Sequence, residues 1–127
     1  MRDMLIAGSG GFIGTIARFY LGAFVTQATT ASRFPFGTLA VNVAGCLVIG
    51  VLGGIAEQSG VLAAQTRLFF FTGVLGGFTT YSAFAYETVF LAREHTWGLA
   101  AANVGAQIAL GLGAVWLGHA AARSMAG

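Results

Sequence analysis

The chain has 127 residues, of which 57% are hydrophobic and 8% are charged, whereas a soluble domain carries about 25% charged residues. So few charges cannot cover a water-exposed surface, and the composition therefore predicts a membrane protein surrounded by lipid bilayer. The net charge of +2 does not indicate nucleic-acid binding, because the arginines are spread along the chain, and we expect no nucleic-acid partner.

Four apolar segments follow one another, each close to the length of about 20 residues that a spanning helix needs. They are residues 4–26, 37–57, 68–92 and 97–122. Pro35 precedes the second segment and suits a helix start, because the first turn of a helix leaves its N–H groups unpaired. We predict an all-α, multi-pass protein of the cell (inner) membrane with four transmembrane helices, in which residues 1–127 form a single transmembrane domain.

The first segment carries a charge and a cluster of glycines. Arg18 lies inside the segment, where it either reaches the lipid headgroups or forms a positive vestibule that attracts anions. Gly10 and Gly14 are four residues apart, as are Gly73 and Gly77 in the third segment. Small residues at this spacing let membrane helices approach closely, so we expect these glycines to pack helices rather than to bind a ligand.

The second segment places Thr38 and Asn42 four residues apart, on one face of a helix. The amide of Asn42 offers two N–H donors and the hydroxyl of Thr38 offers one. Both residues are candidates for an anion pathway. The alternative is an interhelical hydrogen bond, which in membrane bundles is worth about 0.6 kcal/mol.

The third segment contains two adjacent glycines followed by two β-branched residues, Thr79 and Thr80, and this is a poor helix sequence. We predict that the third helix is broken in mid-membrane, with Gly76 and Thr79 on either side of the break. Non-helical backbone at this depth is tolerated only where it is buried in protein or lines a cavity. Its free carbonyl groups can hold a cation.

Donors and rings follow the predicted break. The hydroxyl groups of Thr80 and Ser82 can donate to an anion, while Tyr81 and Phe84 share a face and can turn their electropositive ring edges toward it. The alternative is a kinked, well-packed helix whose aromatic rings face lipid. Glu87, shortly after the rings, either marks the end of the span or faces water near a pore.

The fourth segment carries Asn103 and Gln107 on one face, and Gln107 lies well inside the span. We include Gln107 in the candidate anion pathway, with interhelical bonding as the alternative for both residues. The chain shows no phosphate-binding loop, no metal-ligand cluster and no nucleophile–base pair, and His95 and His119 are isolated. We therefore do not expect an enzyme.

The arginines indicate an unusual topology. With four spans, both termini and the second connection share one side, which would hold Arg2, Arg67 and Arg123, against Arg33 and Arg93 on the other. The positive-inside rule needs a clear excess to fix one orientation, and three against two is a weak bias. The near balance suggests that the chain inserts both ways and that oppositely oriented copies form an antiparallel homodimer.

Three motifs in order resemble the small fluoride-channel family called Fluc or CrcB. The segment from Gly10 to Arg18 resembles its G-G-x-x-G-x-x-x-R pattern. The segment from Gly37 to Gly45 resembles its G-T-L-x-V-N-x-x-G pattern, and that from Gly76 to Phe84 resembles its G-G-x-T-T-F-S-T-F pattern.

The resemblance implies a dual-topology homodimer with two antiparallel pores that passively exports cytoplasmic fluoride and so relieves its toxicity. Asn42 would line the pore, and the two pore phenylalanines of the family fall on Tyr81 and Phe84. A structural sodium ion, which is not transported, would lie at the dimer centre on backbone oxygens of Gly76 and Thr79.

Two departures from the family pattern are Tyr81, in place of a phenylalanine, and Ala83, in place of a threonine. Two other functions stay open. A small dual-topology multidrug or cation exporter needs a membrane-embedded carboxylate, and the first span has only Asp3 at its start, although Glu87 could serve. A non-transporting assembly subunit would use the glycines for packing only, and would leave the predicted break unexplained.

Overall fold

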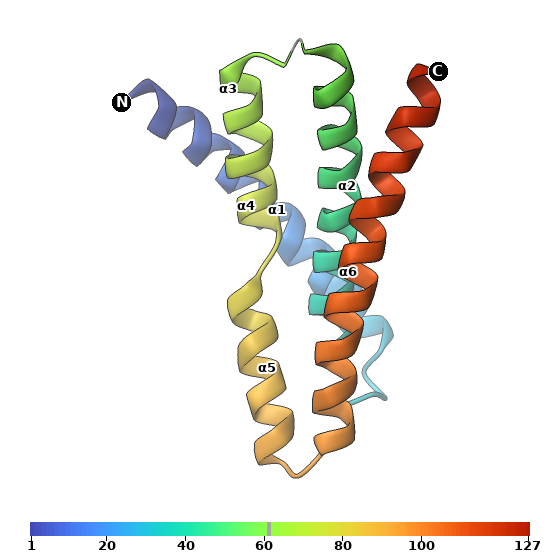
Figure 1. Ribbon diagram of the computed structural model, residues 1–127. Helices are drawn as coiled ribbons and strands as arrows, with labels where there is room; N and C mark the ends of the chain where they lie inside the picture. Colours follow the sequence, from blue (N-terminus) through green and yellow to red (C-terminus); the bar gives the residue numbers. More distant parts are fainter. Residues whose placement is uncertain (61) are drawn as a thin grey trace.

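The computed structural model describes residues 1–60 and 62–127, and over these residues all regular secondary structure is helical. The elements are α1 (Arg2–Ala28), α2 (Phe36–Ser59), α3 (Ala64–Arg67), η1 (Leu68–Leu75), α4 (Gly76–Phe78), α5 (Tyr81–Arg93) and α6 (Trp97–Ala126). Four helical stretches are long and apolar enough to cross a membrane, and the third, Ala64–Arg93, comprises α3, η1, α4 and α5. The predicted all-helical architecture with four candidate spans is thus confirmed (Figure 1).

The four spans alternate in direction. Both termini and the connection from α2 to α3 lie at one end of the molecule in Figure 1, and the other two connections lie at the opposite end. The helix α2 ends at Ser59 because Gly60 adopts the left-handed conformation with φ of 57°, which glycine tolerates without a steric penalty. Arg2 begins α1 and Arg123 lies in the last turn of α6, so both are at the end that holds the termini, whereas Arg33 lies in the connection between α1 and α2 at the opposite end.

Glycines let α1 cross the third span at close range. A Cβ atom added to Gly10 would lie 2.5 Å from the carbonyl oxygen of Phe69, and one added to Gly77 would lie 2.5 Å from the carbonyl oxygen of Gly11. A Cβ atom on Gly14 would clash with the carbonyl oxygen of Val74. The packing role predicted for the glycine pairs is therefore confirmed.

The helices α2 and α6 run side by side over most of their length, as Figure 1 shows. Their contact is also built on glycines: a Cβ atom on Gly54 would lie 2.7 Å from the Cβ atom of Ala122, and one on Gly118 would meet the carbonyl oxygen of Leu47. Val41 on α2 and Asn103 on α6 are the largest side chains that are fully buried among the described residues.

The third span is irregular in two ways. Leu68–Leu75 is a π-helix, a wider form that is rare and often found near functional sites. After α4, Thr79 and Thr80 are extended, with φ, ψ values of −85°, 155° and −146°, 110°, before α5 begins at Tyr81. A broken third helix is therefore confirmed, and the non-helical stretch that joins α4 to α5 is visible in Figure 1.

The break begins later than the sequence suggested. Gly76 is helical, with φ of −62° and ψ of −38°, and the helix continues through Phe78. The glycine pair remains helical because it packs against α1, as the close approach of Gly77 to Gly11 shows. The helix ends only where side chains take over the backbone hydrogen bonds, at Thr79 and Thr80.

Candidate functional site

Asn42 on α2 binds the broken segment through its side-chain amide. The backbone N–H of Thr80 donates to Asn42 Oδ1 at 2.8 Å, and Asn42 Nδ2 donates to the carbonyl oxygen of Thr80 at 3.0 Å. This pairing gives the extended residue two hydrogen bonds of the kind that a neighbouring β-strand would supply. It satisfies backbone groups that would otherwise be costly at membrane depth.

The hydrogen bonds at the break release two carbonyl groups from the helical ladder. In a continuous helix the Thr80 N–H would donate to the carbonyl of Gly76, but here it donates to Asn42. The Ala83 N–H would donate to the carbonyl of Thr79, but here it donates to Thr80 Oγ1 at 3.2 Å, which caps α5. The oxygens of Gly76 and Thr79 have therefore lost their helical donors.

Gln107 on α6 completes the bonding of Asn42. Asn42 Nδ2 donates a second hydrogen bond to Gln107 Oε1, at 3.1 Å. Gln107 Nε2 is buried and has no hydrogen-bond partner among the residues that the structure describes. Three of the four helical spans thus meet at one amide: α2 through Asn42, the third span through Thr80 and α6 through Gln107.

A cavity of about 440 Å³ opens beside this junction. Among the residues that line it are five of the predicted pathway residues and both predicted sodium ligands: Asn42, Thr80, Tyr81, Phe84, Gln107, Gly76 and Thr79. The rings of Tyr81 and Phe84 lie with centroids 5.6 Å apart at an interplanar angle of 65°, and Tyr81 is 80% exposed. The predicted pathway residues therefore gather mostly at one place, on a face that a single chain leaves open.

Two predicted residues lie in a second cavity. Arg18 and Thr38 line a space of about 280 Å³ that Thr80 also lines, so Thr80 borders both cavities. Arg18 is partly buried, and the ion pairs of the described residues do not include it. An unneutralised guanidinium here is consistent with the vestibule that the sequence predicted.

Ser82 is the exception among the predicted pathway residues. It is exposed and is absent from the described linings of both cavities, although its Oγ atom lies 3.4 Å from Thr80 Oγ1. Its neighbour Tyr81 lines the larger cavity instead, because α5 turns about 100° per residue and carries Ser82 away from it.

A second polar layer lies about two turns along α5 from the break. Thr38 Oγ1 donates to Glu87 Oε1 at 2.7 Å. The buried Asn103 donates through Nδ2 to Thr88 Oγ1 at 2.9 Å, and the Thr88 hydroxyl donates to the carbonyl of Phe84 at 2.8 Å. Sequence reasoning missed Thr88, and the only signal that could have indicated it was its position next to Glu87 in a span.

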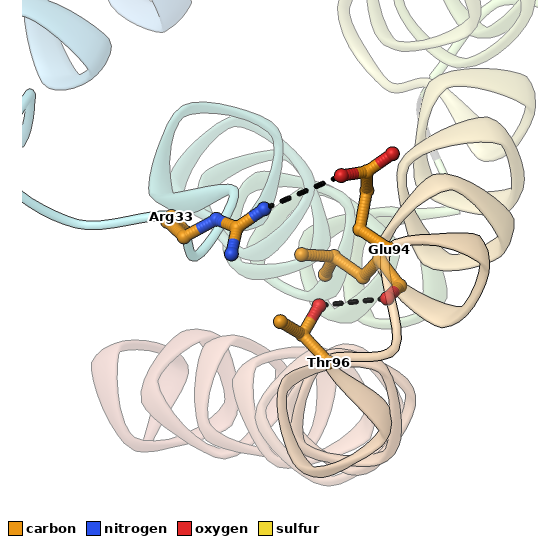
Figure 2. Close-up of polar contacts among 4 residues, drawn as sticks. Arg33, Glu94 and Thr96 are labelled. Atoms are coloured by element: carbon orange, nitrogen blue, oxygen red, sulfur yellow. Dashed lines mark hydrogen bonds and ion pairs between the residues drawn. The ribbon is translucent and has the colours of Figure 1, made fainter.

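At the outer end of this layer, a cavity of about 500 Å³ is lined by Thr38, Glu87 and Arg33. Figure 2 shows the guanidinium of Arg33, in the connection before α2, pointing toward the carboxylate of Glu94, and the two groups are 3.8 Å apart. Beside them Thr96 Oγ1 donates to the carbonyl of Leu91 at 2.7 Å, which fixes the turn between α5 and α6. Both partners of the ion pair are exposed, so it adds little stability.

Comparison with known proteins places the chain in a family. The sequence profile described as CrcB-like protein, Camphor Resistance (CrcB), matches residues 5–119. The chain belongs to the CrcB family. The family resemblance drawn from the three motifs is confirmed by this match.

CrcB relatives cover nearly the whole chain. One from Methylobacillus flagellatus is 45% identical over 118 residues, 93% of this chain and 92% of the relative. One from Opitutus terrae is 45% identical over 124 residues, 96% and 93% of the two chains. One from Paramagnetospirillum magneticum is 41% identical over 124 residues, 96% of each. All three are named fluoride-specific ion channel FluC, which agrees with a multi-pass membrane protein that is not an enzyme.

Proposed function

We propose that this chain is a fluoride-selective ion channel that passively exports cytoplasmic fluoride and so relieves its toxicity. The observation that carries the proposal is the helix break, where uncharged donors and aromatic rings line a cavity in a chain whose full-length relatives are named fluoride channels. The pathway includes Asn42, Tyr81, Phe84, Thr80 and Gln107 around this cavity. Thr38 and Arg18 belong to the adjoining space, and Ser82 is included through its contact with the Thr80 hydroxyl.

The chemistry of the cavity suits a small, strongly hydrated anion. Fluoride gives up its water only where hydrogen-bond donors replace it, and the amide and hydroxyl groups around Thr80 supply such donors. The rings of Tyr81 and Phe84 add electropositive edges without a fixed charge. The described lining contains no Lys or Arg that would hold the ion too tightly, and conduction requires binding weak enough for release. Arg18 acts from the vestibule, where its charge raises the local concentration of anions.

The working unit in this proposal is an antiparallel homodimer with two pores. Tyr81 is 80% exposed and the cavity that it lines is open to the outside of the single chain. The backbone polar groups of the break lie beside this exposed ring. They are unsuited to contact with lipid, which cannot hydrogen-bond to them. A second, inverted copy placed on this face would close each cavity into a path, and the weak charge bias of the connections permits both orientations.

A structural sodium ion fits the same break. The carbonyl oxygens of Gly76 and Thr79 have lost their helical donors, and free carbonyl oxygens of a broken membrane helix are suitable ligands for an alkali cation. No cluster of three His, Cys, Asp or Glu side chains that could hold a metal ion occurs in the described part of the chain. The ligands that we propose for sodium are therefore backbone oxygens. When bound, the ion would supply a fixed positive charge and would join the two copies at the dimer centre.

Glu87 keeps one alternative under consideration. A small multidrug or cation exporter needs a carboxylate in the membrane, and Glu87 lies in the third span with Oε2 unpaired among the described residues. Its other oxygen accepts from Thr38, away from the break. Nothing in that layer accounts for the donors and rings at the break, so we rank the exporter second and the non-transporting assembly subunit third.

Ion efflux from liposomes that contain the purified protein tests the proposal. A fluoride channel releases fluoride rapidly and releases almost no chloride when a potassium ionophore balances charge. An exporter would instead move organic cations against a proton gradient. An assembly subunit would give traces identical to those of empty liposomes. Either of the last two results would overturn the proposed function.

A further inference from the structure

Two cavities meet between α1 and α2. We call the space of about 280 Å³ that contains Arg18 the vestibule cavity, and the space of about 500 Å³ that contains Arg33 the outer cavity. We propose that the anion path continues from the vestibule cavity into the outer cavity, and that the hydroxyl of Thr26 is the hydrogen-bond donor at the neck between them. This inference rests on the proposed function and adds a pathway residue that sequence reasoning missed.

Three residues form the wall that the two cavities share. Thr26 in the last turn of α1, and Gly37 and Thr38 in the first turn of α2, line both spaces. Thr80, at the helix break, joins the vestibule cavity to the cavity of Asn42 in the same way, because it lines both. Shared residues therefore join three cavities in series, from the helix break to the outer end, and the wall of Thr26, Gly37 and Thr38 is the second neck.

The packing at Gly37 places the hydroxyl of Thr26 at this neck. A Cβ atom on Gly37 would collide with Thr26 Oγ1 and would lie 2.9 Å from the carbonyl oxygen of Gly22, so α1 and α2 meet here with no side chain between them. Gly37 is buried, whereas Thr26 is exposed and lines both cavities. The hydroxyl thus lies against the backbone of α2 on one side and borders the two spaces on the other.

The hydroxyl of Thr26 is available to donate. Thr29 Oγ1, also in the outer cavity, donates to the carbonyl oxygen of Val25 at 2.7 Å. Thr38 Oγ1 donates to Glu87 Oε1 at 2.7 Å. The hydroxyl of Thr26, in contrast, takes part in none of the hydrogen bonds of the described residues. It can therefore replace one water molecule of a hydrated anion without breaking a bond within the protein.

The charges around the neck favour an anion. Arg18 lines the vestibule cavity and Arg33 lines the outer cavity, so one arginine lies on each side of the neck. The only carboxylate in the described linings of the two cavities is that of Glu87, and its Oε2 is buried. The pairing of Arg33 with Glu94 is long, at 3.8 Å, and exposed, so it holds Arg33 only weakly. Two arginines against one carboxylate raise the local concentration of anions.

The competing interpretation is a hydroxyl that merely binds water at the membrane surface. Thr26 lies two residues before the end of α1, and two rings of the outer cavity, Tyr86 and Phe90, are 73% and 51% exposed. A cavity with such rings would also suit lipid tails. Under this interpretation the hydroxyl of Thr26 has no effect on ion flux, and substitution separates the two roles.

Thr26→Val tests the donor, because valine keeps the branched shape of threonine and replaces the hydroxyl by a methyl group. We expect fluoride efflux from liposomes to fall about threefold to tenfold, the range that the loss of one hydrogen bond gives. Thr26→Ser keeps the hydroxyl and should stay within about twofold of the parent. Thr15→Val is the matched control, since Thr15 is exposed on the same helix, outside the described linings of the three cavities. Parent-level efflux in Thr26→Val, or an equal loss in Thr26→Ser, would overturn the inference.

Thr26→Cys covers the case in which the valine variant fails to assemble. The background is Cys46→Ala, because Cys46 lines the cavity at the break. A negatively charged methanethiosulfonate reagent forms a mixed disulfide with the new thiol, and the adduct should block most of the efflux until a reductant removes it. Thr15→Cys in the same background should not respond. Absence of labelling, or unchanged efflux after labelling that mass spectrometry shows to be complete, would overturn the inference.

The ion pair beside the outer cavity tests whether the ion passes there. Arg33→Gln should lower fluoride efflux about twofold at low ionic strength, and Glu94→Gln, which releases Arg33, should raise it, with both effects smaller at high salt. Changes of the same sign, or no change in either variant, would show that the path leaves elsewhere and would overturn the inference alone. A parent protein that releases no fluoride would overturn the proposed function as well.

Discussion

Replacing Asn42 by Asp changes a single atom of the junction, and we expect this to abolish fluoride flux without unfolding the protein. The Asp carboxylate still accepts from the Thr80 N–H, which is the bond at 2.8 Å. It can no longer donate to the carbonyl oxygen of Thr80 or to Gln107, and we expect the amide of Gln107 to turn over and donate to the carboxylate. That donation keeps α2 and α6 together.

The charge adds a second and larger effect. A unit negative charge about 5 Å from a passing anion raises its energy by about 3 kcal/mol at an effective dielectric constant of about 20. At about 1.4 kcal/mol for each factor of ten, the predicted loss in flux is more than a hundredfold. The loss of the bonds from Nδ2 is smaller, since a membrane hydrogen bond averages about 0.6 kcal/mol. The predicted loss of flux therefore comes from electrostatic repulsion of the passing anion rather than from a loss of protein stability.

The assay is fluoride efflux from liposomes with a fluoride electrode, on protein checked for dimer elution. Gln65→Glu serves as the control for an amide-to-acid change, because Gln65 is exposed on the short helix α3. We expect its efflux to match that of the parent protein. An Asn42→Asp protein that elutes normally and retains flux within threefold of the parent would refute the account of the junction.

Three further outcomes follow from the structure. Gly14→Ala should destabilise the assembly by about 1–3 kcal/mol, because the new Cβ atom would clash with the carbonyl of Val74, whereas Gly8→Ala has no described atom within 4 Å and should be neutral in thermal-shift measurements. Arg18→Gln should lower fluoride flux several-fold at low ionic strength and less at high salt, and a loss that is independent of salt would argue against a vestibule charge. Replacing sodium by a large organic cation during purification should lower the thermal stability of the dimer, and equal stability in both media would contradict a structural sodium ion.

Sequence patterns were sufficient for the spans and for the existence of the break. An apolar segment of about 20 residues directly indicates a membrane-spanning helix. The two glycines and the nearby Thr79 and Thr80 have low helix propensity, which indicates the break. The end of the helix could not be placed from propensity alone. Gly76 stays helical because α1 packs against this segment, and the helix stops where Asn42, from another span, binds Thr80.

The polar partners within the bundle depend on how the helices are rotated against one another, and one sequence does not contain that information. The contact of Thr38 with Glu87 and that of Asn103 with Thr88 join residues 49 and 15 positions apart. Sequence reasoning likewise treated the N–H groups of Asn42 as available to an anion. The structure uses both of them within the protein, one on the carbonyl oxygen of Thr80 and one on Oε1 of Gln107.

Current through a planar bilayer tests the central claim most directly, because it reports passive conduction and selectivity together. With a fluoride gradient across the membrane and equal chloride on both sides, the account predicts a current that reverses at the equilibrium potential of fluoride. Imposing a chloride gradient or a proton gradient should leave that reversal potential in place. A current that follows chloride or protons, or no current from protein that elutes as an intact assembly, would contradict the account.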